Sequence, residues 1–296
     1  MQNHTGDLDS NGYPRVFKIG VSTSEEDIQE VFRQREPIRL YLERKLGVPV
    51  KYYRVNGYAP IIEALRAKKI HFGTMSPFPY LIARKKANVS AIIFLGNPDG
   101  TSSGLYKSCI LTRKSSGLTN LEDIKKRIST LTLAFVDPAS TSGHIIPHNY
   151  FLSQGINPDK DFKKVIFASN QIAGVLTLYA GKVDVACVQT TIVEAIHKLN
   201  PKASPNDFNY IWVSEAIPPS AYCIRNDISP EFRQNVINAY MDMKKDSAAW
   251  RAVKVQREKH YAGNLPLDSL SFVPVREEVY EPFATMVSKL KDLEIK

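Results

Sequence analysis

The stretch VPVKYYRVNGYAPIIEALRAKKIHFGTM, residues 48–75, determines the fold class. Its first part, 48–55, is rich in the β-branched and aromatic residues that favour a strand. Residues 58–69 have apolar side chains at helical spacing, and 70–75 are strand-like again. A strand, a helix and a strand in this order form a βαβ unit, in which the two strands run parallel. The same alternation continues in both directions, so we expect an α/β protein with largely parallel sheets.

Two interruptions of this alternation predict two lobes. The strand-like residues 105–113 and 220–226 have no helix directly behind them, and they are the natural crossovers of a two-strand hinge. Ligands of open α/β sheets bind beyond the carboxyl ends of the strands, so we expect a site in the cleft between the lobes. The predicted division is a disordered leader at 1–15, lobe 1 at 16–113 plus 221–296, and an inserted lobe 2 at 114–220.

The composition narrows the class of protein. The net charge of +9 is distributed along predicted helices beside acidic residues, as in "LEDIKKR", which argues against a nucleic-acid partner. The chain has no run of 18 apolar residues, and its first fifteen residues have no signal-peptide pattern. It is therefore either cytosolic or a mature chain whose export signal has been removed. The three cysteines show neither metal-type spacing nor a disulfide framework.

Hydroxyl and amide side chains follow the predicted strands, and the segment "DPASTSG" at 137–143 is the richest in them. Backbone N–H groups at the start of a helix accept an oxyanion, and the hydroxyls add further donors. Pro147 lacks the N–H that would bond to the Gly143 carbonyl, so we interpret Ser140 to Gly143 as a separate cradle in front of the helix. No strand end carries paired carboxylates or a Ser, His and Asp set, which indicates a binding site without catalytic residues.

The order of these motifs resembles the phosphonate, phosphite and phosphate substrate-binding proteins of ABC importers. The resemblance extends over 16–275 and depends above all on "VDPASTSG" with "VDVA" downstream. It implies a two-lobe periplasmic-binding fold of type II in an exported or lipid-anchored monomer. Such a protein captures a small oxyanion, delivers it to a membrane ABC permease and needs no cofactor.

The resemblance also implies ligand contacts. Tyrosine hydroxyls of lobe 1 and the hydroxyls of the cradle correspond to the family's ligand-binding residues: Tyr58, Tyr106, Ser140, Thr141 and Ser142. Aminophosphonate-binding relatives have a histidine where this chain has Gln171, and acidic residues where it has Thr191 and Ser220. An ammonium group would remain unpaired there, so we expect phosphite, phosphate or a phosphonate without an amino group. Ser76, at another strand end, is a further candidate donor.

Alternative interpretations depend on a few other residues. Cys109 could supply a thiolate to arsenite in a receptor that docks on a sensor kinase, although a cysteine on a strand is more often an apolar filler. His144 and His148 are four residues apart, but no third metal ligand is evident, so we expect no metal site. An enzyme on the same fold would need a general base or nucleophile, which the predicted site does not offer.

Overall fold

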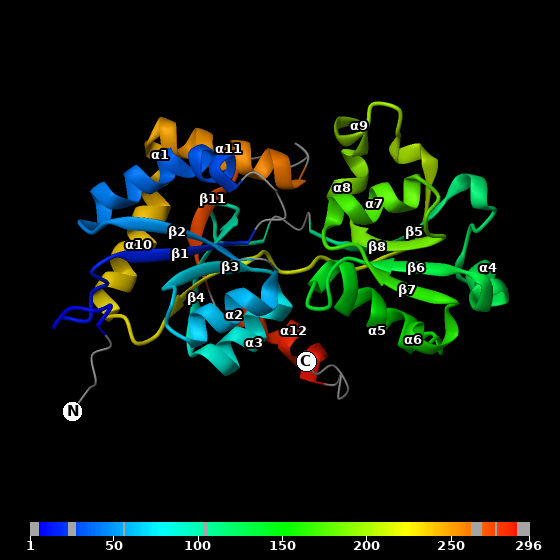
Figure 1. The fold of residues 1–296 in the computed structure, drawn as a ribbon, viewed down its shortest axis with the longest axis horizontal. Coiled ribbons are helices and arrows are strands. Elements are labelled where there is room, and N and C mark those ends of the chain that lie inside the picture. The colour runs from blue at the N-terminus through cyan, green and yellow to red at the C-terminus, as the bar shows by residue number, and fades with distance from the viewer. Residues whose placement is uncertain are drawn as a thin grey trace. The chain divides into compact units, whose positions relative to one another are not determined.

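The computed structural model describes residues 6–22, 28–55, 57–102, 106–261, 268–275 and 277–288. The chain divides into two compact units. Unit 1 comprises Met1–Ser103, Pro219–Gln256 and Pro266–Thr285, and unit 2 comprises Gly104–Pro218, Arg257–Leu265 and Met286–Lys296. Each unit has its own sheet with helices on both faces (Figure 1). This arrangement confirms the expected α/β class.

Unit 1 is built on a six-stranded sheet of order β11-β4-β10-β3-β1-β2. Its strands are β1 (Phe17–Ser22), β2 (Val50–Val55), β3 (Phe72–Met75), β4 (Val89–Gly96), β10 (Ala221–Arg225) and β11 (Ser271–Pro274). The helices that lie or begin in unit 1 are α1 (Ile28–Leu46), α2 (Tyr58–Arg66), α3 (Pro77–Ala87), α10 (Pro230–Asp242), α11 (Ser247–Tyr261) and α12 (Glu281–Ser288). Strand β1 is parallel to β2 and β3, whereas β10 is antiparallel to both of its neighbours.

The two faces of this sheet are buried by different helices. Apolar side chains of α2 and α3 form one core cluster with Ala91, Ala221 and Cys223 of the sheet. On the other face Phe72 stacks on Tyr240 of α10 at a centroid distance of 5.4 Å. Both faces are therefore apolar, which explains why β4 and β10 inside the sheet are nearly continuous hydrophobic runs.

Unit 2 is built on a five-stranded sheet of order β7-β6-β8-β5-β9. Its strands are β5 (Ser108–Arg113), β6 (Thr132–Phe135), β7 (Lys164–Phe167), β8 (Val185–Gln189) and β9 (Phe208–Val213). Its helices are α4 (Leu121–Arg127), α5 (Ile146–Ser153), α6 (Pro158–Asp161), α7 (Gln171–Tyr179), α8 (Thr190–Glu194) and α9 (Ile196–Leu199), and a π-helical turn, η3 (Thr141–Ile145), leads into α5. Helices α7 and α8 pack on one face of the sheet, and α5 and α6 pack on the other (Figure 1).

Local sequence signals explain where several helices begin. Asn120 caps α4 by accepting a hydrogen bond from the Asp123 N–H, and Asn170 caps α7 in the same way. In α4 the acidic residues lie in the first turn and the basic residues in the last, which suits the helix dipole. Pro77 occupies the first position of α3, where a missing N–H costs nothing.

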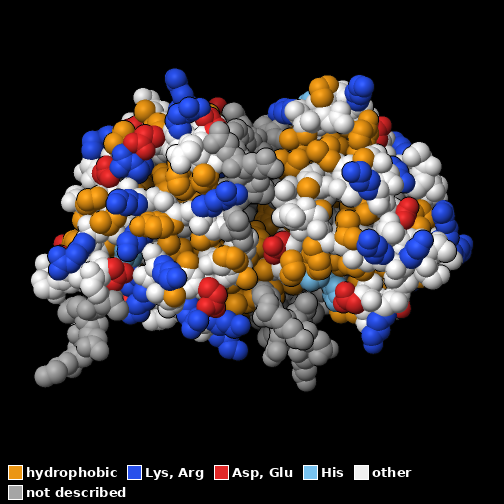
Figure 2. Space-filling model, viewed as in Figure 1, with side chains coloured by type: hydrophobic (Ala, Val, Ile, Leu, Met, Phe, Trp, Pro, Cys, Tyr) orange, Lys and Arg blue, Asp and Glu red, His pale blue; other side chains and the backbone are white. Residues whose placement is uncertain are grey.

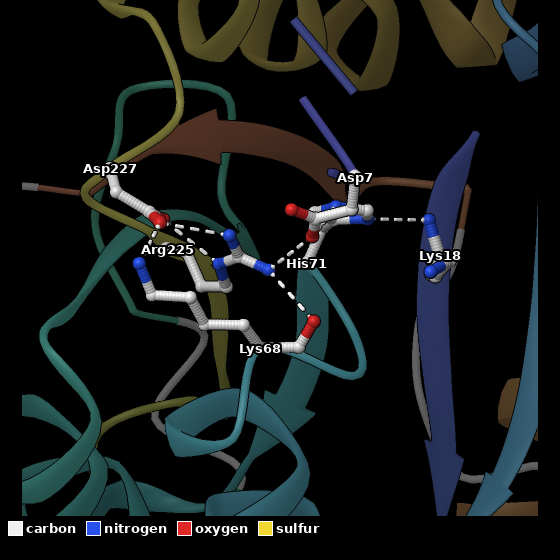
Figure 3. A network of polar contacts seen from close by, with 6 residues as sticks. All are labelled: Asp7, Lys18, Lys68, His71, Arg225 and Asp227. Carbon is white, nitrogen blue, oxygen red and sulfur yellow. Dashed lines mark hydrogen bonds and ion pairs between the residues drawn. The ribbon is translucent and has the colours of Figure 1, made fainter. Parts of the chain in front are cut away.

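The start of the described chain is anchored to unit 1 by a buried charge network (Figure 3). Arg225, which is 2% exposed, donates to Asp7 Oδ2 at 2.9 Å and makes a bidentate pair with Asp227 at 2.8 Å. His71 is fully buried, and its Nδ1 accepts from the Lys18 N–H at 2.9 Å. Its Nε2 must therefore carry the proton and donate to Asp7 Oδ2 at 3.0 Å.

The structure corrects three details of the sequence interpretation. Residues 6–15, expected to belong to a disordered leader, are held by the Asp7 contacts and by a bridge between Leu8 and Pro14, while residues 1–5 lie outside the described chain. The expected lobe 1 strand near 105–113 pairs with β8 and β9 and thus belongs to unit 2. Because β5 and β10 are antiparallel to their neighbours, both sheets are mixed and not largely parallel.

Charged side chains of both signs lie on the surface (Figure 2). On the face shown in Figure 2, Lys and Arg side chains are scattered over both units with Asp and Glu side chains between them. In the part of the chain that the structure describes, no helix has the length and apolar character needed to cross a membrane.

Candidate functional site

Most of the buried polar side chains of unit 2 gather at one edge of its sheet. Parallel strands β6, β7 and β8 end at this edge, and the antiparallel strand β5 begins there. The fully or almost fully buried polar residues at this edge are Ser108, Ser140, Thr141, Ser142, Gln189, Thr190, Thr191 and Ser214. Ligands of open α/β sheets bind beyond the carboxyl ends of the strands, so this edge is the candidate site.

The segment after β6 forms a tight turn with its own hydrogen bonds. Ser140 is the N-cap residue of η3, and its Oγ accepts from the Gly143 N–H at 3.1 Å. The Ser140 carbonyl accepts from both His144 and Ile145, which gives the π-helical spacing of this turn. A regular α-helix begins only at Ile146, with Pro147 in its first turn. The cradle predicted in front of the helix is therefore a π-helical turn, and the Ser140 hydroxyl keeps its O–H as a donor.

Gly143 is required because the turn lies directly against β6. A Cβ atom at this position would come within 2.4 Å of Val136 Cγ2 and 2.5 Å of Val136 Cβ. The Gly143 carbonyl in turn accepts from the Val136 N–H at 3.0 Å. The reason for glycine is thus close backbone approach, which fixes the turn at the end of the strand.

Ser142 is at the centre of the hydrogen-bond network. It is fully buried, and its Oγ accepts from Tyr106 Oη at 3.0 Å and from Gln171 Nε2 at 3.1 Å. Gln171 Oε1 accepts from the Gln189 N–H at 2.9 Å, which fixes the orientation of the Gln171 amide. Since a hydroxyl has two acceptor lone pairs, both are engaged, and the Ser142 O–H is left to donate. The structure thus brings the predicted Tyr106, Ser142 and Gln171 into contact.

Sequence reasoning missed two residues of this network. Ser108 is fully buried, and its Oγ donates to the Ser142 carbonyl at 2.6 Å. Gln189 ends β8, and its backbone N–H holds Gln171. The available signal was the polar residue that begins the strand "SCILTR" and the one that ends the strand "VACVQ".

The titratable groups near η3 have structural partners. Asp137 Oδ1 accepts from the Ala139 N–H at 2.8 Å, and burial raises the pKa of its carboxyl. The His144 Nδ1 lies 2.7 Å from the Pro138 carbonyl and donates to it, and burial lowers the pKa of His144 to about 4. Among the described residues, no group of three His, Cys, Asp or Glu side chains could hold a metal ion.

Cys109 is placed in the hydrophobic core and not among the polar residues of the site. It is fully buried with Val188 and Ile192, and its Sγ donates to the Val188 carbonyl at 3.4 Å. Burial raises the pKa of its thiol, which disfavours the thiolate that would bind arsenic. Cys109 and Cys187 belong to clusters on opposite faces of the sheet, so they do not face each other.

The remaining candidates lie in unit 1. Tyr58 is the first residue of α2, and Ser76 is the buried N-cap residue of α3. Ser220 immediately precedes β10 and is partly exposed. Tyr106, expected in the same lobe as Tyr58, instead lies in unit 2, where its carbonyl accepts from the Ile217 N–H at 2.7 Å.

Comparisons with known proteins agree with this architecture. Residues 19–280 match the family model of the periplasmic substrate-binding protein of phosphonate ABC transporters. The chain is 28% identical over 230 residues to a phosphonates-binding periplasmic protein of Escherichia coli, covering 77% of this chain and 66% of that protein. It is 21% identical to a phosphate-import protein of Mycolicibacterium smegmatis, covering 75% and 70% of the two chains.

A solved structure has the same fold. The binding protein component of an ABC phosphonate transporter from Pseudomonas aeruginosa superposes with a TM-score of 0.76 at 23% identity, covering 92% of this chain and 85% of that one. The two sheets with helices on both faces are thus those of a type II periplasmic binding protein. The chain belongs to the family of periplasmic substrate-binding proteins of phosphonate ABC transporters.

Proposed function

We propose that the protein captures a small phosphorus oxyanion, namely phosphite, phosphate or a phosphonate without an amino group, and delivers it to a membrane ABC permease. The main observation that supports this proposal is the set of hydrogen bonds around the Ser142 hydroxyl. Because its oxygen accepts from Tyr106 and Gln171, its O–H remains to donate to a ligand. We further propose that the protein acts as a monomer and catalyses no reaction.

The supporting chemistry uses neutral donors. Ser142 lies in the first turn of η3, where a helix N–H group has no acceptor within the helix, and it adds its hydroxyl. Ser140 and Thr141 provide two more hydroxyls, which we propose as ligand contacts together with Gln171 and, in unit 1, Tyr58, Ser76 and Ser220. Hydrogen bonds from neutral donors to an anion are each worth about 1.5–3 kcal/mol, so several converging bonds give tight binding.

We propose that 2-aminoethylphosphonate is a poor ligand. Thr191 is almost fully buried, and neither Thr191 nor Ser220 has a charge to pair with an ammonium group. A desolvated, unpaired cation costs several kcal/mol. Calorimetry that finds this compound bound more tightly than phosphate, phosphite and methylphosphonate would contradict the proposal.

Calorimetric titration of wild type and Ser142→Ala tests the main proposal. The wild type is expected to bind at least one of phosphate, phosphite and methylphosphonate, and the variant to bind it about tenfold to a hundredfold more weakly. Ser153→Ala is a matched control, since the exposed Ser153 hydroxyl donates to the Tyr150 carbonyl and accepts from Gln154 Nε2, away from the Ser142 network. Wild type that binds none of the three anions, or equal losses in both variants, would refute the proposal.

A further inference from the structure

Two buried polar atoms at the candidate site have no hydrogen-bond partner in the described part of the chain. They are Gln189 Nε2 and Thr191 Oγ1, and their residues are 2% and 3% exposed. A buried donor without a partner costs about 1–3 kcal/mol, so native proteins rarely retain one without a use. Both residues lie at the junction of β8 and α8.

The sheet register places the Gln189 side chain beside η3. Gln189 is directly opposite Ser108 in the antiparallel pair of β8 and β5, so their side chains are on the same face of the sheet. The Ser108 hydroxyl donates to the Ser142 carbonyl, which places this face against the turn that carries Ser142. The Gln189 side chain therefore lies on the face of the sheet that η3 covers at Ser142.

The backbone of Gln189 already serves the same network. Its N–H donates to Gln171 Oε1, and Gln171 Nε2 donates to Ser142 Oγ. The side-chain amide thus belongs to the residue at the rigid end of β8 whose backbone N–H orients Gln171 and, through it, Ser142. A donor held in this way loses little conformational entropy when it binds a ligand.

We propose that Gln189, together with Thr191, recognises an oxygen atom on the fourth substituent of the bound phosphorus centre. This inference rests on the proposed function and narrows its ligand class. The amide N–H donates to that oxygen, and the Thr191 hydroxyl accepts its proton where the substituent is a hydroxyl. The ligand is then phosphate or a hydroxyalkylphosphonate, in preference to phosphite or methylphosphonate, which have hydrogen or methyl at this position.

Two matched ligand pairs test the proposal by calorimetry, because the members of each pair differ by one oxygen atom. The pairs are phosphate with phosphite, and hydroxymethylphosphonate with methylphosphonate. In the wild type we expect the oxygen-bearing member of at least one pair to bind about tenfold more tightly or better. The pair that shows this difference identifies whether the oxygen is bonded to phosphorus or to carbon.

Gln189→Leu removes the amide while nearly preserving the side-chain volume. It should reduce the affinity for the oxygen-bearing member about tenfold and change the affinity for its partner less than about twofold. Since Nε2 has no partner to lose among the described residues, the urea midpoint should stay unchanged or rise. Thr191→Val is the second variant. If Gln189→Leu does not fold, Thr191→Val tests the inference by the same loss of affinity for the oxygen-bearing member of the pair.

The other outcomes overturn the inference. Wild type that discriminates in neither pair, or a Gln189→Leu variant that weakens both members of a pair equally, means that Gln189 does not contact the fourth substituent. These outcomes leave the proposed function intact, because the anions still bind. Wild type that binds none of the four anions refutes the proposed function and this inference together.

Discussion

Replacement of Asp7 by alanine should destabilise unit 1 although Asp7 lies at the start of the described chain. Asp7 Oδ2 accepts from Arg225 Nη1 at 2.9 Å and from His71 Nε2 at 3.0 Å. Without it, the acceptor that Arg225 Nη1 retains within the described chain is the Lys68 carbonyl at 3.1 Å, and the His71 N–H loses Asp7 as its acceptor (Figure 3). Removing one partner of a buried ion pair costs about 3–5 kcal/mol, and the surviving pair with Asp227 reduces this to roughly 2–4 kcal/mol.

The assay is urea unfolding followed by tryptophan fluorescence. The chain has two tryptophans, Trp212 in unit 2 and Trp250 in unit 1. In a Trp212→Phe background the buried Trp250 is the remaining tryptophan. Its ring centroid lies 6.1 Å from that of Phe272 in the unit 1 sheet, so its fluorescence reports on that unit. In this background Asp7→Ala should lower the midpoint of the Trp250 transition.

Glu63→Ala is the matched control because it also removes an acid of unit 1 that pairs with an arginine. Glu63 is 55% exposed, and its pair with Arg66 should contribute about 0–1 kcal/mol. The reasoning is refuted if Asp7→Ala and Glu63→Ala shift the midpoint equally. That result would mean that Arg225 and His71 find other acceptors when Asp7 is removed.

Two further predictions concern the turn and the histidines. Gly143→Ala should lower the free energy of unfolding by about 1–3 kcal/mol in urea titrations, because the added Cβ would overlap Val136. An unchanged midpoint would show that Val136 moves aside without cost. His71 and His144 are each buried with a pKa lowered to about 4 from the ordinary 6.5, so the unfolded chain binds their protons first as the pH falls. Both contributions should therefore be present in full above pH 6.5, and the free energy of unfolding should decrease between pH 6.5 and 4 by roughly 2–3 kcal/mol per histidine. Urea midpoints that do not change over this pH range would contradict the assignment.

Much of the fold could be predicted because its signals are local. Hydrophobic period indicated the strand, helix and strand of residues 48–75, which the structure shows as β2 (Val50–Val55), α2 (Tyr58–Arg66) and β3 (Phe72–Met75). Strand pairing is not local, and this is why β5 was expected in the wrong lobe. Its partners β8 and β9 lie more than 70 residues further along the chain, and the pattern of β5 alone does not distinguish a crossover from a central strand.

The candidate site could be predicted in part for the same reason. The hydroxyl cluster at 140–142 is visible as a motif, and the structure shows how it is held. The roles of Ser108 and Gln189 depend on register, because they become neighbours only when β5 pairs with β8. The anchoring of Asp7 depends on Arg225, 218 residues away, so a polar leader in the sequence resembled disorder.

The placement of titratable groups separates the pH dependence of binding from that of folding. The Ser142 network consists of a phenol, a hydroxyl and an amide, and it contains no carboxylate or imidazole. A histidine at the position of Gln171 would titrate near physiological pH and couple affinity to pH. The buried histidines His71 and His144 instead have structural partners in the two units. Acid should therefore reduce binding through the ionisation of the ligand and through unfolding, and the protein's own affinity for a given ionic form should remain constant until unfolding begins.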